Sequence, residues 1–141
     1  MTPVPNPIDC NCLALRQAAR HISQIYDRHL APAGLRTTQY SILMKLNRLG
    51  PLSINELADA MVMDRTTLGR AIRPLERERL LAIEAGKDAR TRSLRLTAAG
   101  EARLKAAIPR WRAAQKAFEA AYGIGAAADL RTALRQVVAA A

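Results

Sequence analysis

Hydrophobic positions recur at intervals of three and four residues along most of the chain, a spacing typical of helices with one buried face. Two short segments, 81–85 and 93–96, instead alternate apolar and polar residues, as the strands of a hairpin do. The helical pattern covers 10–30, 38–48, a short stretch after Ser53, 65–79, 98–122 and a last stretch after Gly125. The pattern predicts a mainly helical fold with one small β-hairpin.

Polar residues that cap helices mark where several of these helices begin. Ser53 and Glu56 have the spacing of a capping box, in which each side chain accepts a bond from the other residue's main-chain N–H. Asp64 and Thr97 precede later helices and are good N-caps. Asp9 is expected to cap the first helix in the same way. The caps divide the middle of the chain into two short helices joined by a tight turn.

The helix over 65–79 has two opposite faces when its residues are placed at about 100° intervals. One face is apolar and must pack inward: Leu68, Ala71, Ile72 and Leu75. The opposite face is basic and is flanked by Thr67 and Gly69: Thr66, Arg70, Arg73 and Arg77. On its own, such a helix would be interpreted as a solvated basic face. Its position after a short capped helix favours nucleic acid instead, because guanidinium groups match phosphate oxygens and guanine acceptors.

The predicted hairpin has an apolar face and a basic tip. Its inward positions are expected to be Leu81, Ile83, Leu94 and Leu96. Gly86, Lys87 and Asp88 can form the turn, and Lys87, Arg90 and Arg92 make the tip basic. Asp88 is two residues before Arg90, so its carboxylate is expected to hold the Arg90 guanidinium in one outward pose. An ordinary charged hairpin tip is the alternative interpretation.

Composition and charge point to a polyanionic partner. The 141 residues carry a net charge of +10 with a pI near 10.8, and half of them are hydrophobic but only 4% are aromatic. One domain of this size can build a core from aliphatic side chains. No stretch reaches the roughly 18 apolar residues of a membrane span, and the N-terminus lacks the basic start and apolar run of a signal peptide. We therefore expect a cytoplasmic protein that binds nucleic acid and not a membrane.

Several of these residues together resemble the winged helix-turn-helix of the MarR family of bacterial transcriptional regulators. They are Asp64-Arg65-Thr66-Thr67, Arg70, Leu75-Glu76, Asp88-x-Arg90 and Leu96-Thr97-x-x-Gly100. The last two motifs are the most specific, and the likeness extends over nearly the whole chain. The resemblance implies a recognition helix in the major groove and a wing arginine in the minor groove. Pro74 departs from the pattern, because a proline inside the recognition helix is expected to kink it.

The residues expected to contact DNA lie in the recognition helix and the wing. They are Arg65, Thr66, Thr67, Gly69, Arg70, Arg73, Arg77, Lys87, Asp88, Arg90 and Arg92. Nothing in the sequence suggests an enzyme or a cofactor, because it has no catalytic triad, glycine-rich phosphate loop or close carboxylate pair. The alternative is a basic helical dimer that binds an acidic protein. A log–log salt slope of about −0.9 per neutralised phosphate would distinguish DNA binding from that alternative.

The two ends of the chain are expected to form a homodimer. Residues 1–8 predict a disordered arm, 9–31 and 98–141 predict dimerisation helices, and 32–97 predict the winged helix-turn-helix module. The apolar stripes of the terminal helices have little core left to cover them within one chain. Pairing across a two-fold axis is therefore favoured over a monomer whose terminal helices fold back. Such a dimer, most simply a repressor, reads a pseudo-palindromic operator with half-sites about 10 bp apart or a multiple of that.

Cys10 and Cys12 are the two cysteines of the chain and are candidates for a thiol sensor. Both are expected in the first turn of a helix, where unsatisfied N–H groups favour a thiolate, with Arg16 one turn beyond Cys12. A C-x-C spacing on a helix is expected to keep the two sulfurs apart. Metal ligation is disfavoured because His21 and His29 lie two turns and more away.

Within the MarR family, the segment Cys12-Leu13-Ala14-Leu15 followed by Tyr26 resembles the organic-peroxide sensors. The resemblance implies that Cys12 reacts with peroxide and that tyrosines hydrogen-bond it. The position of the second tyrosine is occupied by Thr37, which departs from that pattern. A structural or incidental cysteine is the alternative interpretation.

The resemblance also implies a cleft between the dimerisation helices and the winged module, where small aromatic acids act as effectors. Tyr40, Trp111 and His29 are candidates to line this cleft, although aromatic and histidine side chains at helical spacing are more often part of a core. With either effector, we expect release from DNA through a changed spacing of the two recognition helices.

Overall fold

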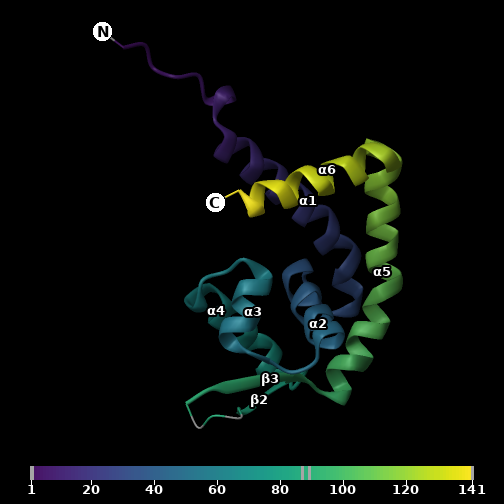
Figure 1. The fold of residues 1–141 in the computed structure, drawn as a ribbon. Helices are drawn as coiled ribbons and strands as arrows, with labels where there is room; N and C mark the ends of the chain where they lie inside the picture. Colours follow the sequence, from purple (N-terminus) through teal and green to yellow (C-terminus); the bar gives the residue numbers. More distant parts are fainter. Residues whose placement is uncertain (1, 87, 89, 141) are drawn as a thin grey trace.

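The computed structural model describes residues 2–86, 88 and 90–140, and their fold is mainly helical (Figure 1). The elements follow one another as α1 (Asn11–Leu30), α2 (Thr37–Leu49), β1 (Leu52–Ser53), α3 (Ile54–Met61), α4 (Arg65–Arg77), β2 (Leu81–Ala85), β3 (Arg92–Leu96), α5 (Ala98–Tyr122) and α6 (Ile124–Ala139). Short 3-10 helices occupy Pro7–Asp9 and Ala31–Ala33. The long helix α5 joins the sheet end of the molecule to α6, which turns back from its far end (Figure 1). The expected fold class is confirmed.

A small antiparallel sheet forms the wing beside the helices. Its strand order is β1-β3-β2, and β2 pairs with β3 so that Leu81 faces Leu96 and Ile83 faces Leu94. These are the four positions expected on the inward face of the hairpin. Strand β1 was not predicted; it is only two residues long and pairs Leu52 with Leu94. Two residues are too few to show an alternation of apolar and polar positions, so the strand is recognised only from its pairing with β3.

The core is aliphatic and lies where the C-terminal part of α1, the helices α2 to α4, the sheet and the first half of α5 meet. Its largest fully buried side chains are Leu30, Ile42, Leu43, Leu57, Leu68, Leu75, Leu80, Leu81, Leu94 and Leu104. Tyr40 joins this core and stacks on Trp111, with ring centroids 5.9 Å apart and planes inclined by 13°. Each fully buried leucine stabilises the fold by about 1.5–3 kcal/mol relative to an exposed one. This core fixes α4 and the wing as one unit.

Most of the expected helix caps are present. The Ser53 hydroxyl accepts from the Glu56 N–H and the Glu56 carboxylate accepts from the Ser53 N–H, each at 3.1 Å. Asp64 and Thr97 cap α4 and α5 as expected.

The expected cap of the first helix at Asp9 is wrong. Asp9 belongs to a 3-10 turn, which the Asn6 side chain caps by accepting from the Ile8 N–H at 3.0 Å. Because of this turn, the α-helix begins at Asn11, one residue later than the expected start at Cys10. Cys10 is therefore the N-cap of α1, and its sulfur accepts from the Leu13 N–H at 3.4 Å.

Helix α4 continues through Pro74 and ends at Arg77, two residues earlier than expected. Proline has no N–H, so the Arg70 carbonyl loses its usual partner one turn later. At the end of the helix, the Glu78 N–H donates to the Pro74 carbonyl at 3.0 Å. The next residue, Arg79, has a left-handed backbone with φ of 60°. The recognition helix is thus one continuous element over the residues that carry its basic face.

The terminal helices present an apolar surface that the chain leaves uncovered. Helix α1 packs along α5, and α6 packs on α5 near its far end. The large side chains left exposed on these helices are Leu15, Tyr122, Ile124, Leu134, Val137 and Val138. We call this set the uncovered terminal surface. None of the described helices is long and apolar enough to cross a membrane.

Candidate nucleic-acid interface

Helices α3 and α4 form a helix-turn-helix in which one side of α4 is anchored in the core. Leu68 and Leu75 are fully buried and Ile72 is 5% exposed. The turn between the helices passes through Val62, whose φ of 53° is left-handed, and the Met63 N–H bonds the Ala58 carbonyl at 2.9 Å. The residues on the opposite side are all exposed: Arg65, Thr66, Thr67, Arg70, Arg73 and Arg77. The structure therefore brings the expected basic residues of α4 onto one outward face.

The N-terminus of α4 is fixed by the carboxylate of Asp64. One oxygen of Asp64 accepts from the Thr67 N–H at 2.7 Å, and the other accepts from the Thr67 hydroxyl at 3.0 Å. These hydrogen bonds, the backbone one above all, lower the pKa of Asp64 below its ordinary value. Because the Thr67 hydroxyl donates its proton to Asp64, its oxygen can only accept a hydrogen bond from a bound partner. Thr66, beside it, is exposed.

The arginines of α4 have no carboxylate partner within the described part of the chain. The ion pairs found there join Arg95 to Glu84, Arg103 to Glu78, Lys105 to Glu101 and Arg131 to Glu119. A surface helix normally mixes charges of both signs, so a face with several unpaired guanidiniums accumulates positive potential. This face is chemically suited to phosphate oxygens and to acceptors on guanine.

Gly69 lies on the flank of this face, half-buried. A Cβ atom built on Gly69 would meet no protein atom within 4 Å. The fold itself therefore does not require glycine here, and glycine lowers helix stability by about 0.8–1.0 kcal/mol relative to alanine. A glycine at this position would be explained if a binding partner approaches this flank of α4 closely.

The wing places Arg90 and Arg92 in exposed positions at and beside its tip. The expected contact of Asp88 with the Arg90 guanidinium is wrong, because the Asp88 carboxylate accepts from the Arg90 main-chain N–H at 3.2 Å. The Asp88 carbonyl also accepts from the Thr91 N–H and hydroxyl, each at 2.9 Å. Asp88 thus shapes the main chain of the turn and leaves the guanidinium free to reach outward. Lys87, also expected at the tip, lies outside the described residues.

The structure does not bring Cys12 and Tyr26 together within one protomer. Both lie on α1, fourteen positions apart in sequence, which corresponds to about 21 Å along a helix. The Tyr26 hydroxyl instead donates to the Gln115 side chain on α5. Burial, followed by the negative charge of Glu119, raises the pKa of Tyr26 above its ordinary value. Both cysteines are exposed, and no cluster of metal-ligating side chains occurs among the residues described.

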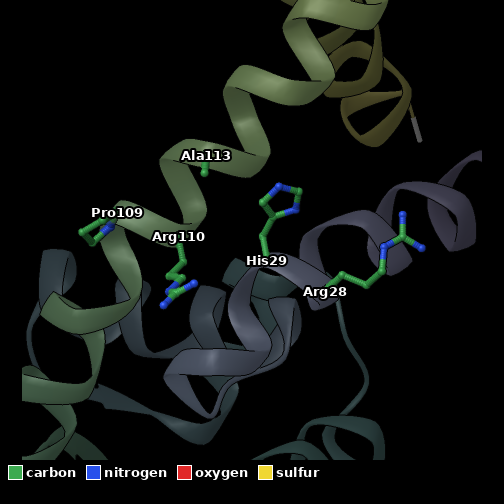
Figure 2. A pocket seen from close by; sticks show the side chains of 5 residues that line it. All are labelled: Arg28, His29, Pro109, Arg110 and Ala113. Atoms are coloured by element: carbon green, nitrogen blue, oxygen red, sulfur yellow. The ribbon is translucent and has the colours of Figure 1, made fainter.

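The expected effector cleft is split between two separate hollows. Tyr40 and Trp111 line one of about 430 Å³ on α2 and α5, together with Ser41, Met44, Lys45, Arg48 and Leu49. His29 lines another of about 530 Å³, and Figure 2 shows its ring pointing toward α5 while Arg28 and Arg110 point elsewhere. The Nδ1 of His29 lies 2.9 Å from the Ile25 carbonyl, which can only accept, so Nδ1 carries the proton. His29 therefore does not share a site with Tyr40 and Trp111.

A helix-turn-helix with a basic outward face and a basic hairpin beside it defines a winged-helix DNA-binding protein. Comparison with known proteins narrows this class. The model of the MarR family matches residues 35–86, which span α2 to β2. YwoH of Bacillus subtilis, an uncharacterised HTH-type transcriptional regulator, is 30% identical over 87 residues, which cover 62% of this chain and 64% of YwoH.

Solved structures show the same likeness over more of the chain. The M. tuberculosis transcriptional regulator MosR in complex with DNA has a TM-score of 0.81 and 36% identity, covering 93% of this chain and 98% of MosR. A probable transcriptional regulator from Pseudomonas aeruginosa has a TM-score of 0.83 and 26% identity, covering 94% of this chain and 99% of that one. The chain belongs to the MarR family and is a non-enzymatic DNA-binding transcriptional regulator.

Proposed function

We propose that the protein is a repressor that binds a pseudo-palindromic operator as a homodimer and is released by an effector. The single observation that carries DNA recognition is the outward face of α4, where exposed arginines, without carboxylate partners among the described residues, lie opposite the buried Leu68, Ile72 and Leu75. We place α4 in the major groove, with Thr66, Arg70 and Arg73 contacting bases and phosphates. We place the wing over the minor groove, where Arg90 and Arg92 meet the backbone or the groove floor.

The homodimer is supported by the uncovered terminal surface. We assign residues 9–31 and 98–141 to dimerisation and 32–97 to DNA binding. Val137 and Val138 are 52% and 63% exposed, and Ile124 is 72% exposed, so burial against a second copy would stabilise the pair through the hydrophobic effect. Two copies related by a two-fold axis would present two α4 helices to half-sites about 10 bp apart or a multiple of that.

Two effectors fit different parts of the chain. Cys12 is exposed at the start of α1, where an organic hydroperoxide can reach it. Its thiolate would be oxidised to a sulfenic acid while the hydroperoxide is reduced to the alcohol. The second effector is a small aromatic acid in the hollow beside Tyr40 and Trp111, where Lys45 could attract its carboxylate. Either effector would act by changing the distance between the two α4 helices.

A gel-shift assay on the intergenic DNA upstream of the gene tests both the DNA binding and the thiol switch. Wild type, Cys12→Ser and Cys10→Ser are compared with and without an organic hydroperoxide. We expect peroxide to release wild type and Cys10→Ser but not Cys12→Ser. Release of all three proteins, or of none, would exclude Cys12 as the sensor and direct attention to the hollow beside Trp111. Failure of all three to shift the DNA would contradict the proposed operator.

A further inference from the structure

The segment Leu96-Thr97-x-x-Gly100 leads from β3 into α5 and contacts the residues that follow the recognition helix α4. After α4 ends, the chain passes through Arg79, whose φ of 60° is unusual for a residue with a side chain. The Arg79 carbonyl then accepts from the Thr97 hydroxyl at 2.7 Å. Arg79 and Thr97 are 18 positions apart in sequence, so this bond ties two distant segments.

Thr97 makes a second and a third bond at the same place. Its main-chain N–H donates to the Leu80 carbonyl at 3.2 Å. Its hydroxyl oxygen accepts from the Gly100 N–H at 3.0 Å and so caps α5. One hydroxyl therefore bonds both the exit of α4 and the first turn of α5. We call this arrangement the Thr97 junction.

Gly100 lets the two backbones meet directly. A Cβ atom on Gly100 would lie 1.9 Å from the Leu80 carbonyl oxygen and 2.8 Å from a methyl carbon of Leu96. Any side chain here would push α5 away from the segment that leaves α4. Glycine is required by this close approach, in contrast to Gly69, which faces open space.

The next turn of α5 contacts the same region through Arg103. Its Nη1 lies 3.8 Å from a carboxylate oxygen of Glu78, the C-cap residue of α4. The same nitrogen donates to the Gly34 carbonyl at 3.4 Å, in the corner between α1 and α2. The beginning of α5 thus holds the exit of α4 at two successive points.

From these contacts we infer that Thr97 is a positioning residue that fixes the tilt of α4 relative to α5. The inference rests on the proposed function, because α5 leads into the terminal helices that we assign to the dimer (Figure 1). In a dimer built on those helices, the Thr97 junction sets the spacing of the two recognition helices. The hydroxyl lies behind α4, beyond its last residue, so removing it leaves the outward basic face intact. Thr97 therefore controls which operator spacing is accepted, and it does not contribute to the affinity of one α4 for one half-site.

The test uses a duplex selected by the wild-type protein from a randomised library. The selected duplex is then remade with one base pair inserted or deleted between its half-sites, and as a single half-site. One base pair moves a half-site by about 3.4 Å and rotates it by about 34°, so wild type should lose about tenfold or more in affinity. Thr97→Val keeps the shape of the side chain but has no hydroxyl, and we expect it to lose only about threefold or less. Both proteins should bind the single half-site within about twofold of each other.

Three further variants separate positioning from capping and folding. Thr97→Ser keeps the hydroxyl and should retain the wild-type dependence on spacing. Thr97→Asp can still cap α5 but cannot donate to the Arg79 carbonyl, so it should relax the spacing dependence like Thr97→Val. If Thr97→Val fails to fold, Thr97→Asp alone tests whether the hydroxyl controls the spacing dependence. Thr132→Val is the matched control, because it removes a hydroxyl that bonds the Ala128 carbonyl within α6.

Two results would contradict this inference, and they can be told apart. If folded, dimeric Thr97→Val or Thr97→Asp discriminates spacing as sharply as wild type, the positioning role is wrong and the proposed function stands. If wild type selects no duplex with two half-sites, the proposed function fails and the inference fails with it.

Discussion

The winged module and the terminal helices use the same amphipathic pattern with opposite outcomes. In α4 the apolar stripe is closed off within the chain, since Leu68 and Leu75 are fully buried and Ile72 nearly so. In α6 only Ala127 is buried. Leu134 is 38% exposed, and Val137 and Val138 are more exposed still. Amphipathic spacing therefore predicts which face of a helix must be covered. It does not predict whether the same chain or a second copy covers that face.

The charged faces of the two regions differ as well. The exposed arginines of α4 lack carboxylate partners in the described structure, whereas Arg131 on α6 pairs with Glu119 at 3.7 Å and Lys105 on α5 pairs with Glu101 at 3.7 Å. Exposed pairs of this kind contribute about 0–1 kcal/mol and reduce the local positive potential. Helix α4 thus combines a buried apolar face with exposed arginines that lack carboxylate partners among the described residues, whereas α6 combines exposed apolar side chains with an arginine, Arg131, that is paired.

Truncation of a leucine in the closed core should change stability more than any other substitution considered. Leu68→Ala should lower the free energy of unfolding by about 2–5 kcal/mol, because it leaves a cavity in a closed core. Leu134→Ala is the companion variant, and its effect should shrink as the protein is diluted, because Leu134 is 38% exposed in one chain and the proposed dimer would cover the exposed part. Thermal melts over a hundredfold range of concentration measure both. A concentration-independent loss for Leu134→Ala would indicate that α6 is covered within the chain.

The next effect concerns base recognition. Arg70→Ala should weaken operator binding by about 1–3 kcal/mol and relax the preference at one base pair, because the proposed contact of its guanidinium with guanine would be lost. Arg95→Ala is a matched control, since Arg95 is already bonded to Glu84 at 2.7 Å across the wing strands. Binding to a panel of single-base operator variants is the measurement. A uniform loss over the panel would reassign Arg70 to a phosphate.

A smaller change separates folding from binding on the same helix. Gly69→Ala should raise the free energy of unfolding by up to about 1 kcal/mol, because alanine favours the helix and meets no protein atom. The same methyl group should weaken operator binding if DNA approaches this flank closely. Denaturant unfolding and operator titration are run on one preparation. A variant that is both more stable and equally tight in binding would remove Gly69 from the interface.

Loss of one arginine from the wing should have a weaker effect. Arg90→Ala should weaken binding to every duplex alike and flatten the log–log salt slope by about one unit, because the proposed phosphate contact would be lost. Titrations at four salt concentrations provide the slope. Arg110→Ala, a change on α5 far from the wing, should leave it unaltered. If the slope of Arg90→Ala also stays the same, the wing arginine is not a phosphate contact.

What could be predicted from the sequence depended on whether the signal was local. The faces of α4, the paired aliphatic residues of the hairpin and the caps at Ser53, Asp64 and Thr97 follow from residue type and spacing, and all are present. The capping role of Cys10 was missed because the 3-10 turn before it is only three residues long. A turn of that length leaves no periodicity to detect.

Other features depend on residues distant in sequence. The bond from Tyr26 to Gln115 spans 89 positions, and the bond from Thr97 to Arg79 spans 18. The partner of Asp88 is local, but the sequence does not distinguish the Arg90 guanidinium from the Arg90 main-chain N–H. For the candidate site, the spacing of residues located the basic face. Only the structure revealed that its arginines lack acidic partners within the part of the chain that it describes.

A hydroxyl-radical footprint on a duplex that the protein selects from a randomised library tests whether two α4 helices read DNA together. We expect two protected patches on one face of the duplex, with centres about one helical turn or a whole number of turns apart, each flanked by wing protection in the minor groove. A single patch, patches on opposite faces, or no protection at binding saturation would contradict recognition of DNA by a two-fold pair of α4 helices.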